Sequence, residues 1–252
     1  MSTVLVPDEP GILSRGRLRD YAWWQLRDYL INKGIATALI SGLLLFVVWS
    51  EARDEGITEM MVVAKSAFPL YINNVMLFGV LFATNGIVSE DRKLGYYRFY
   101  FSKPVSVAAF YAQKFLVNLS GLVLVTVTML AIFAQVLAPI YPPPLAAVFP
   151  MLIVGLAGIG FLLSAIFTFD WLTLLAVYAL AQVGWLLWGD DAGIRGMLVR
   201  ALPPVHRLGD VYAAVARGEP FSMAPVWWVF LYGLACFFLG LVVVSRRKLA
   251  TS

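Results

Sequence analysis

Residues 66–106 read SAFPLYINNVMLFGVLFATNGIVSEDRKLGYYRFYFSKPVS and join a long apolar run to a charged, aromatic loop. The apolar run, about Ser66–Val88, is long enough to cross a bilayer as an α-helix, which needs about 20 mostly apolar residues. The loop at 89–106 carries six charged side chains and five aromatic rings. Such a surface is suited to docking another protein, because aromatic and Arg side chains dominate the energetics of interfaces. The alternative is a solvated basic loop whose rings rest on lipid headgroups.

Five further apolar runs flank this one along the chain. They are about Gly34–Ser50, Ala109–Leu137, Ala146–Phe169, Trp171–Trp188 and Pro225–Val244. The whole chain of 252 residues is 61% apolar and 13% charged, whereas a soluble domain has about a quarter of its residues charged. The sequence therefore predicts an all-α polytopic membrane protein with six transmembrane helices.

Residues 17–31, which precede the first run, are too charged to span a membrane. On a helical wheel Leu18, Ala22 and Leu26 share one face, and Arg27 lies opposite. This pattern is typical of an interfacial helix that lies in the headgroup plane. The alternative is that the segment is simply the start of the first span.

The long loop at 189–224, between the fifth and sixth runs, is predicted to hold two short helices. Residues 194–202 are apolar with spaced Arg, and the pair Pro203-Pro204 ends that stretch. Residues 205–216 form a second amphipathic stretch, which Gly218 stops. We expect both helices at the outer surface, where they would cap the bundle.

Lys and Arg are distributed unevenly between the two sides of this predicted topology. Twelve lie before the first run, in the 89–106 loop and in the tail after the last run, against six in the opposite loops. By the positive-inside rule both termini are expected in the cytoplasm. The net charge of +4 is therefore interpreted as a signal for orientation and for anionic lipid, not for nucleic acid.

The sequence lacks the motifs of a self-powered transporter or of an enzyme. It has no Gly-x-x-x-x-Gly-Lys-Ser/Thr motif, so it has no P-loop for ATP. No acidic or basic residue lies well inside a run, which argues against ion coupling. The single cysteine, Cys236, and the single histidine, His206, belong to no metal-binding cluster. We expect a non-catalytic chain with no metal and no cofactor of its own.

Polar and small side chains form patterns inside the runs. Asn73 and Thr84 are eleven residues apart, close to three helical turns, and Asn74 and Asn85 have the same spacing. This stripe of side chains either lines a path or holds the bundle together by hydrogen bonds between helices. Both interpretations stay open.

The fifth run has a matching stripe, with Tyr178 and Gln182 near its middle. In the fourth run, Gly155, Gly158 and Gly160 are expected to allow close helix packing and not to bind phosphate, because no phosphate reaches mid-membrane.

Taken in order, these features resemble the ABC-2 type transporter permeases. In that family the loop between the second and third spans has an acidic residue, a Gly about five positions later, and a Pro-Val-Ser before the next span. Here Glu90, Gly95 and Pro104-Val105-Ser106 match that pattern. The resemblance covers nearly the whole chain. It implies one permease domain over 1–252, with a type V exporter-like fold, in the cytoplasmic (inner) membrane of a bacterium or archaeon.

The resemblance also implies roles for individual residues. The 89–106 loop would be the coupling loop that docks an ATP-binding cassette ATPase, through Glu90, Asp91, Arg92, Gly95, Tyr96, Tyr97, Arg98, Phe99 and Pro104. The second and fifth spans would border the substrate path, at Asn73, Asn74, Phe78, Tyr178 and Gln182.

The expected function is that of a transmembrane permease subunit of an ATP-binding cassette exporter. Two permeases, identical or paired with a similar chain, would join two separate ATPase subunits that hold ATP and Mg²⁺. Two alternatives are a stand-alone carrier or channel, and a membrane scaffold or assembly factor.

Overall fold

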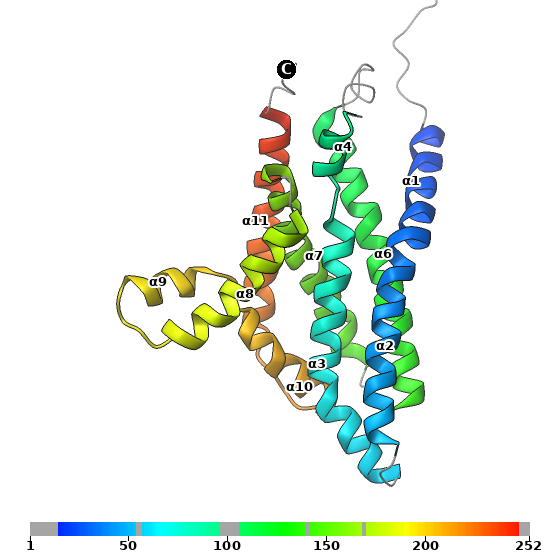
Figure 1. The fold of residues 1–252 in the computed structure, drawn as a ribbon, viewed down its shortest axis with the longest axis vertical. Helices are drawn as coiled ribbons and strands as arrows, with labels where there is room; N and C mark the ends of the chain where they lie inside the picture. The colour runs from blue at the N-terminus through cyan, green and yellow to red at the C-terminus, as the bar shows by residue number, and fades with distance from the viewer. Residues whose placement is uncertain (1–14, 54–56, 96–105, 140–141, 168–169, 247–252) are drawn as a thin grey trace, which may run out of the picture.

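The computed structural model describes residues 15–53, 57–95, 106–139, 142–167 and 170–246, and all regular elements in these ranges are helical (Figure 1). The elements are α1 (Arg15–Tyr29), the π-helix η1 (Leu30–Gly34), α2 (Ile35–Ala52), α3 (Ile57–Thr84), α4 (Ser89–Lys93), α6 (Val107–Val136), α7 (Pro142–Ile166), α8 (Asp170–Trp188), α9 (Ile194–Ala201), the 3-10 helix η2 (Val205–Arg207), α10 (Leu208–Arg217) and α11 (Ala224–Arg246).

Six of the helical stretches are long and apolar enough to cross a membrane, which confirms the predicted fold class. They are Tyr21–Ala52, Met60–Lys93, Val107–Val136, Pro144–Ile166, Trp171–Trp188 and Ala224–Arg246. By the length and composition of these helices, the chain is a multi-pass membrane protein.

The first span differs from its predicted form because the helix continues through its N-terminal segment. Residues 17–31 are helical, but α1 passes through η1 directly into α2, and the three lie in line in Figure 1. No Pro interrupts this stretch, so nothing ends the helix between the charged and the apolar parts. The alternative, in which the segment begins the first span, therefore describes this continuous helix better than an in-plane helix does.

The length of this first helix accounts for its interfacial character. Its 32 residues from Tyr21 to Ala52 extend over about 48 Å, at about 1.5 Å per residue, whereas the hydrocarbon core is about 30 Å thick. Its N-terminal turns therefore project beyond the hydrocarbon. Trp23 and Trp24, 67% and 60% exposed, lie on this part, where indole rings favour the headgroup region.

The polypeptide crosses the bundle so that both described ends lie together. Figure 1 shows the N-terminal end of α1, the short helix α4 and the C-terminal end of α11 at one end of the molecule. An even number of crossings requires this arrangement. The predicted topology, with the 89–106 loop on the same side as the two ends, has the same geometry.

Close packing of α7 against α11 depends on glycines, as the sequence predicted for the fourth span. A Cβ atom added to Gly155 would lie 2.7 Å from the carbonyl oxygen of Val229. Cβ atoms added to Gly158 and Gly233 would overlap backbone atoms of Gly233 and Gly155 respectively. The two backbones are therefore in direct contact, which only residues without a side chain allow.

The loop at 189–224 contains the two predicted short helices, and their surroundings differ. Helix α9 is mostly exposed, whereas α10 packs against α3 inside the bundle. Val211, Tyr212 and Val215 of α10 are each at most 3% exposed, and the Tyr212 ring stacks on Phe149. Gly218 ends α10 in the left-handed conformation, with φ of 73°. Helix α10 is thus part of the core and not only a cap over it.

We predict that Gly158→Leu destabilises the fold by about 1–3 kcal/mol or more, because its side chain must separate two helices in backbone contact. Thermal unfolding of the detergent-purified chain, followed by tryptophan fluorescence, measures the change. Gly42→Leu in α2 is the matched control, since no atom lies within 4 Å of an added Cβ there. Equal melting temperatures for the two variants would contradict the packing described above.

Candidate functional site

The site is built where α3 stops and the chain turns into α4. Helix α3 ends at Thr84, and four residues of turn separate it from α4 at Ser89. Gly86 makes this turn possible because its φ of 76° lies in the left-handed region that other residues rarely adopt. A helix that ends leaves its last carbonyl oxygens without partners in the helix. In a membrane protein those oxygens need donors from elsewhere in the chain.

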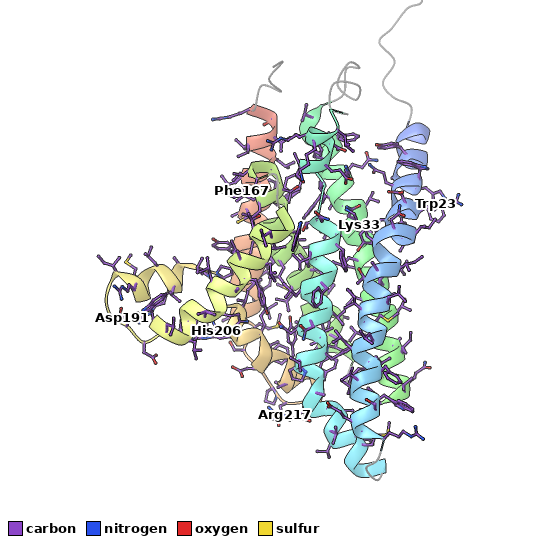
Figure 2. All side chains as sticks on the ribbon, in the orientation of Figure 1. Trp23, Lys33, Phe167, Asp191, His206 and Arg217 are labelled. Atoms are coloured by element: carbon purple, nitrogen blue, oxygen red, sulfur yellow. The ribbon has the colours of Figure 1, made fainter. Side chains whose placement is uncertain are left out.

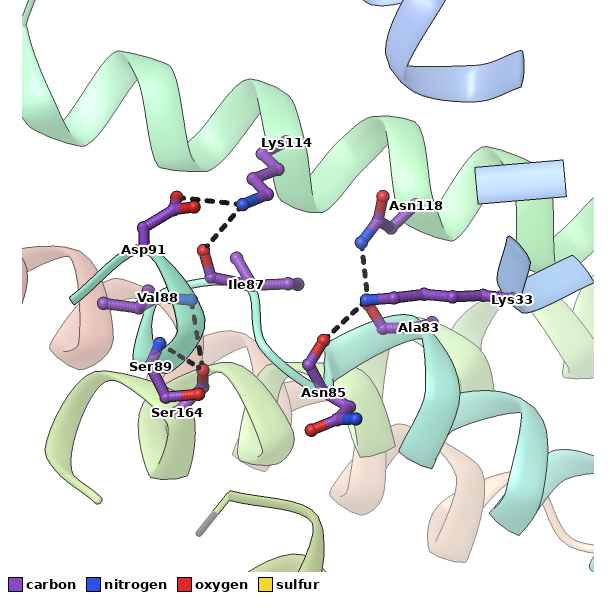
Figure 3. Close-up of polar contacts among 10 residues, drawn as sticks. All are labelled: Lys33, Ala83, Asn85, Ile87, Val88, Ser89, Asp91, Lys114, Asn118 and Ser164. Carbon is purple, nitrogen blue, oxygen red and sulfur yellow. Dashed lines mark hydrogen bonds and ion pairs between the residues drawn. The ribbon is translucent and has the colours of Figure 1, made fainter. Parts of the chain in front are cut away.

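Side chains from neighbouring helices supply the donors (Figure 3). Asn118 Nδ2 of α6 donates to the carbonyl oxygen of Ala83 at 2.8 Å. Lys33 Nζ of η1 donates to that of Asn85 at 2.5 Å, and Lys114 Nζ of α6 donates to that of Ile87 at 3.2 Å. Two ammonium groups thus lie at the negative end of the α3 dipole, where positive charge is stabilising.

Helix α4 is tied to the bundle by its inward-facing side. The Asp91 carboxylate, in a residue 5% exposed, accepts from Lys114 Nζ at 2.9 Å. On the opposite side, Ser164 Oγ of α7 accepts from the backbone N–H groups of Val88 at 3.2 Å and Ser89 at 3.4 Å. These contacts hold the first turn of α4 between α6 and α7 (Figure 3).

Arg92 adds a second tie between α4 and α7. Its Nη1 atom donates to the carbonyl oxygen of Ala165 at 3.3 Å. Lys114 carries two roles at once, because the same ammonium group binds the Ile87 carbonyl and the Asp91 carboxylate. We name the set Lys33, Asp91, Lys114, Asn118 and Ser164 the elbow clamp.

The predicted coupling residues differ in how deeply they are buried. Glu90 is exposed, whereas the next residue, Asp91, points into the bundle. Arg92 is partly buried against α7. Asp91 and Arg92 therefore both help to anchor α4. Gly95 has φ of 71° and open space around it, as expected for a tight bend. Five predicted residues lie outside the described residues: Tyr96, Tyr97, Arg98, Phe99 and Pro104.

The far end of the predicted coupling loop re-enters the bundle through a helix cap. Ser106 has an extended backbone, and its Oγ accepts from the N–H of Ala109 at 3.4 Å. A hydroxyl at this position satisfies one of the unpaired N–H groups in the first turn of α6. The Ser of the Pro-Val-Ser pattern therefore has a local structural role, which is to start the third span.

Three of the five predicted path residues meet between α3 and α8. Tyr178 Oη donates to Asn73 Oδ1 at 2.8 Å, and Gln182 Nε2 donates to Tyr178 Oη at 3.3 Å. Asn74 instead donates to the carbonyl oxygen of Leu70 in its own helix, and Phe78 packs against the core. The bond from Asn73 to Tyr178 joins two helices, as the bundle-holding interpretation of the stripe requires.

The sequence did not lead us to Lys33, Lys114, Asn118 or Ser164. By sequence, Lys33 is one of the basic residues before the first run and Lys114 lies near the end of the third run, so neither was expected at a buried site. One signal was present: Lys114 and Asn118 are four residues apart and therefore share one face of a helix. A lysine and an amide on one face of an apolar helix indicate a buried acceptor, because burying such groups unpaired is costly.

We predict that Lys114→Met destabilises the protein by about 3 kcal/mol, because it leaves the buried Asp91 carboxylate without its ion-pair partner. Unfolding of the detergent-purified chain by increasing SDS, followed by circular dichroism, measures the loss. The double variant Asp91→Asn with Lys114→Met is expected to recover part of it.

Arg217→Met is the control for that cycle. Arg217 pairs with Glu219 at 3.2 Å, but their side chains are 58% and 53% exposed, so the loss is expected to stay below about 1 kcal/mol. Similar small losses for Lys114→Met and Arg217→Met would show that the ion pair between Lys114 and Asp91 stabilises the fold no more than a surface ion pair does.

For the polar contact between α3 and α8, we predict a coupling energy of about 0.6 kcal/mol, and at most about 1.7, between Asn73→Ala and Tyr178→Phe. A double-mutant cycle in the same unfolding assay measures it. Asn74→Ala with Tyr178→Phe is the matched cycle, because Asn74 binds its own helix, and its coupling energy should be close to zero. Equal coupling in both cycles would contradict the assigned hydrogen bond.

Comparison with known proteins does not identify a family for this chain, so its function must be inferred from the residues described above. The chain matches no protein-family model, no curated protein and no solved structure. By its fold the chain is a multi-pass membrane protein, and the turn after α3 and helix α4 are held by side chains from η1, α6 and α7.

Proposed function

We propose that this chain is the permease subunit of an ATP-binding cassette exporter of the ABC-2 type. In this proposal the chain forms the substrate path and a separate ATPase, which holds ATP and Mg²⁺, supplies the energy. Two permease chains, identical or similar, join two ATPase subunits. The order of six spans, the α4 turn and the short helices before the last span support this assignment.

The observation that carries the proposal is the anchoring of α4. This five-residue helix exposes Glu90 on one side and fixes Asp91 on the other. A partner that moves α4 therefore moves the end of α3 directly, and it pulls on α6 and α7 through Lys114 and Ser164. A short element with an exposed face and a rigid attachment to several spans is well suited to receive force.

The position of α4 in the bundle agrees with an energy source in the cytoplasm. It lies at the same end as both described ends of the chain (Figure 1). In the predicted topology that side carries twelve Lys and Arg residues against six on the other, and the positive-inside rule assigns it to the cytoplasm. The proposed location is the cytoplasmic membrane of a bacterium or archaeon, with the 89–106 loop facing the compartment that contains ATP.

The hydrogen bond between α3 and α8 fits a path that is closed in this conformation. Tyr178 holds Asn73 across the two helices, and Gln182 extends the contact along α8. A shift of α3, driven from α4, would break the bond from Tyr178 to Asn73 and separate the helices. Amide and phenol groups without fixed charge would then line the opening, as suits amphipathic cargo more than small ions.

We predict that Glu90→Ala combined with Tyr96→Ala abolishes co-purification of this chain with a P-loop ATPase encoded beside its gene. The reason is that the double variant removes an exposed carboxylate and an aromatic ring from the docking loop. Both chains are co-expressed, the permease is captured by a tag, and the ATPase is quantified by immunoblot. Membrane insertion should stay normal.

Glu219→Ala is the control, since Glu219 is an exposed carboxylate in the loop after the fifth span, before the last span. ATPase recovery that is unchanged in the double variant would contradict docking at the loop. Full transport activity of the isolated chain in lipid vesicles, without any ATPase, would instead favour the stand-alone carrier.

A further inference from the structure

A second site lies away from α4, where α8, the short helices and α11 meet. A cavity of about 860 Å³ opens there, and Figure 2 shows His206 at this junction. Such a volume falls in the range of about 300–1,000 Å³ that is usual for ligand pockets. Most of the side chains in its wall are apolar, among them Leu202, Val211, Phe221 and Trp228. The wall therefore favours a ligand with a substantial apolar part.

Two guanidinium groups give the cavity positive charge. Arg200 donates to the backbone oxygens of Gly189 at 3.3 Å and Asp191 at 3.1 Å. The Arg207 guanidinium carbon lies 5.8 Å from the centre of the Trp185 ring. Within the described ranges neither arginine forms an ion pair. Asp210 is the single carboxylate in the wall, so one positive charge remains in excess.

His206 adds an unused polar atom to the same wall. Its ring stacks on Trp185, with 3.9 Å between the ring centroids and 9° between the planes. Its Nε2 atom is buried and has no hydrogen-bond partner in the part of the chain that the structure describes. Burial, and then the charge of Arg207, lower the pKa of His206, so the ring is neutral near pH 7. An unpaired ring nitrogen in the wall is a hydrogen-bonding group that a ligand in the cavity can use.

The cavity is also within reach of lipid. Leu186 and Leu187 at the end of α8, next to Trp185 in the wall, are 83% and 60% exposed. Exposed leucines at the end of a membrane span contact acyl chains in a bilayer. A lipid-like molecule can thus enter the cavity from the bilayer beside α8 and place its headgroup among the polar side chains.

We propose that this cavity binds an anionic amphiphile, with the acidic headgroup held by Arg200 and Arg207 and its apolar chain along the wall that contains Phe221 and Trp228. Guanidinium groups bind phosphate and carboxylate oxygens through charge-assisted hydrogen bonds, which are the stronger class. His206 Nε2 provides a further polar contact to the headgroup. The site is independent of the proposed coupling to an ATPase and exists in the isolated chain.

Native mass spectrometry of the detergent-purified full chain tests this proposal. The probes are phosphatidylglycerol and phosphatidylcholine with identical acyl chains, which differ only in headgroup. We expect the wild-type chain to retain phosphatidylglycerol preferentially. Arg200→Gln with Arg207→Gln should weaken its retention about tenfold or more, as expected for lost charge-assisted hydrogen bonds, and leave phosphatidylcholine unaffected.

Arg195→Gln is the matched control, because Arg195 is exposed on the same helix as Arg200 but is not part of the cavity wall. Arg207→Lys keeps the charge and should retain the preference. Arg200→Gln can prove unstable by size-exclusion chromatography, because it removes two hydrogen bonds to the backbone. The single variant Arg207→Gln then tests the proposal, since Arg207 donates no hydrogen bond within the described residues and its loss should not disturb the fold.

Three results would overturn the proposal. The first is equal retention of the two lipids by the wild-type chain. The second is a loss of preference in Arg195→Gln as large as in the double variant. The third is displacement of phosphatidylglycerol by soluble glycerol phosphate at equal concentration, because it would mean that the apolar wall contributes nothing and the site binds a free anion.

Discussion

The end of α3 imposes the constraint on which much of this structure depends. A helix that stops inside a membrane protein exposes carbonyl oxygens where water is scarce, and the chain must supply donors for them. Lys33, Lys114 and Asn118 do so from two other helices. Because lysine ammonium groups are strongly hydrated, their burial is favourable only with such acceptors and with the Asp91 carboxylate nearby. The turn at Gly86 and the positions of η1 and α6 are therefore mutually dependent.

Two kinds of contact divide the bundle into parts with different character. Helices α7 and α11 meet backbone to backbone through glycines, with no polar side chain needed at the contact. Helices α3 and α8 meet instead through Asn73, Tyr178 and Gln182, and α8 is the least buried of the spans. A glycine contact brings two backbones close together, whereas the contact between α3 and α8 includes a single side-chain hydrogen bond, which is individually weak. The structure thus combines a closely packed helix pair with a less buried span.

Run length and helix breakers made the spans and the short helices predictable from the sequence. Pro203-Pro204 and Gly218 end α9 and α10 close to where these residue types predict. The sequence could not predict that Asp91, and not Glu90, points into the bundle. The two residues are neighbours in a five-residue helix, and only the position of Lys114 in the folded chain distinguishes them. The sequence could not predict the burial of α10 either, since its amphipathic pattern suits a membrane surface as well as packing against α3.

The contact between α10 and α3 has a consequence for biosynthesis. Helix α3 leaves the ribosome long before α10, which is translated only after the fifth span. The face of α3 that packs against α10 must therefore wait, covered by lipid or by insertion machinery, until most of the polypeptide has been made. Contacts between segments so distant in sequence form late and slowly. The second span thus reaches its final surroundings only near the end of synthesis.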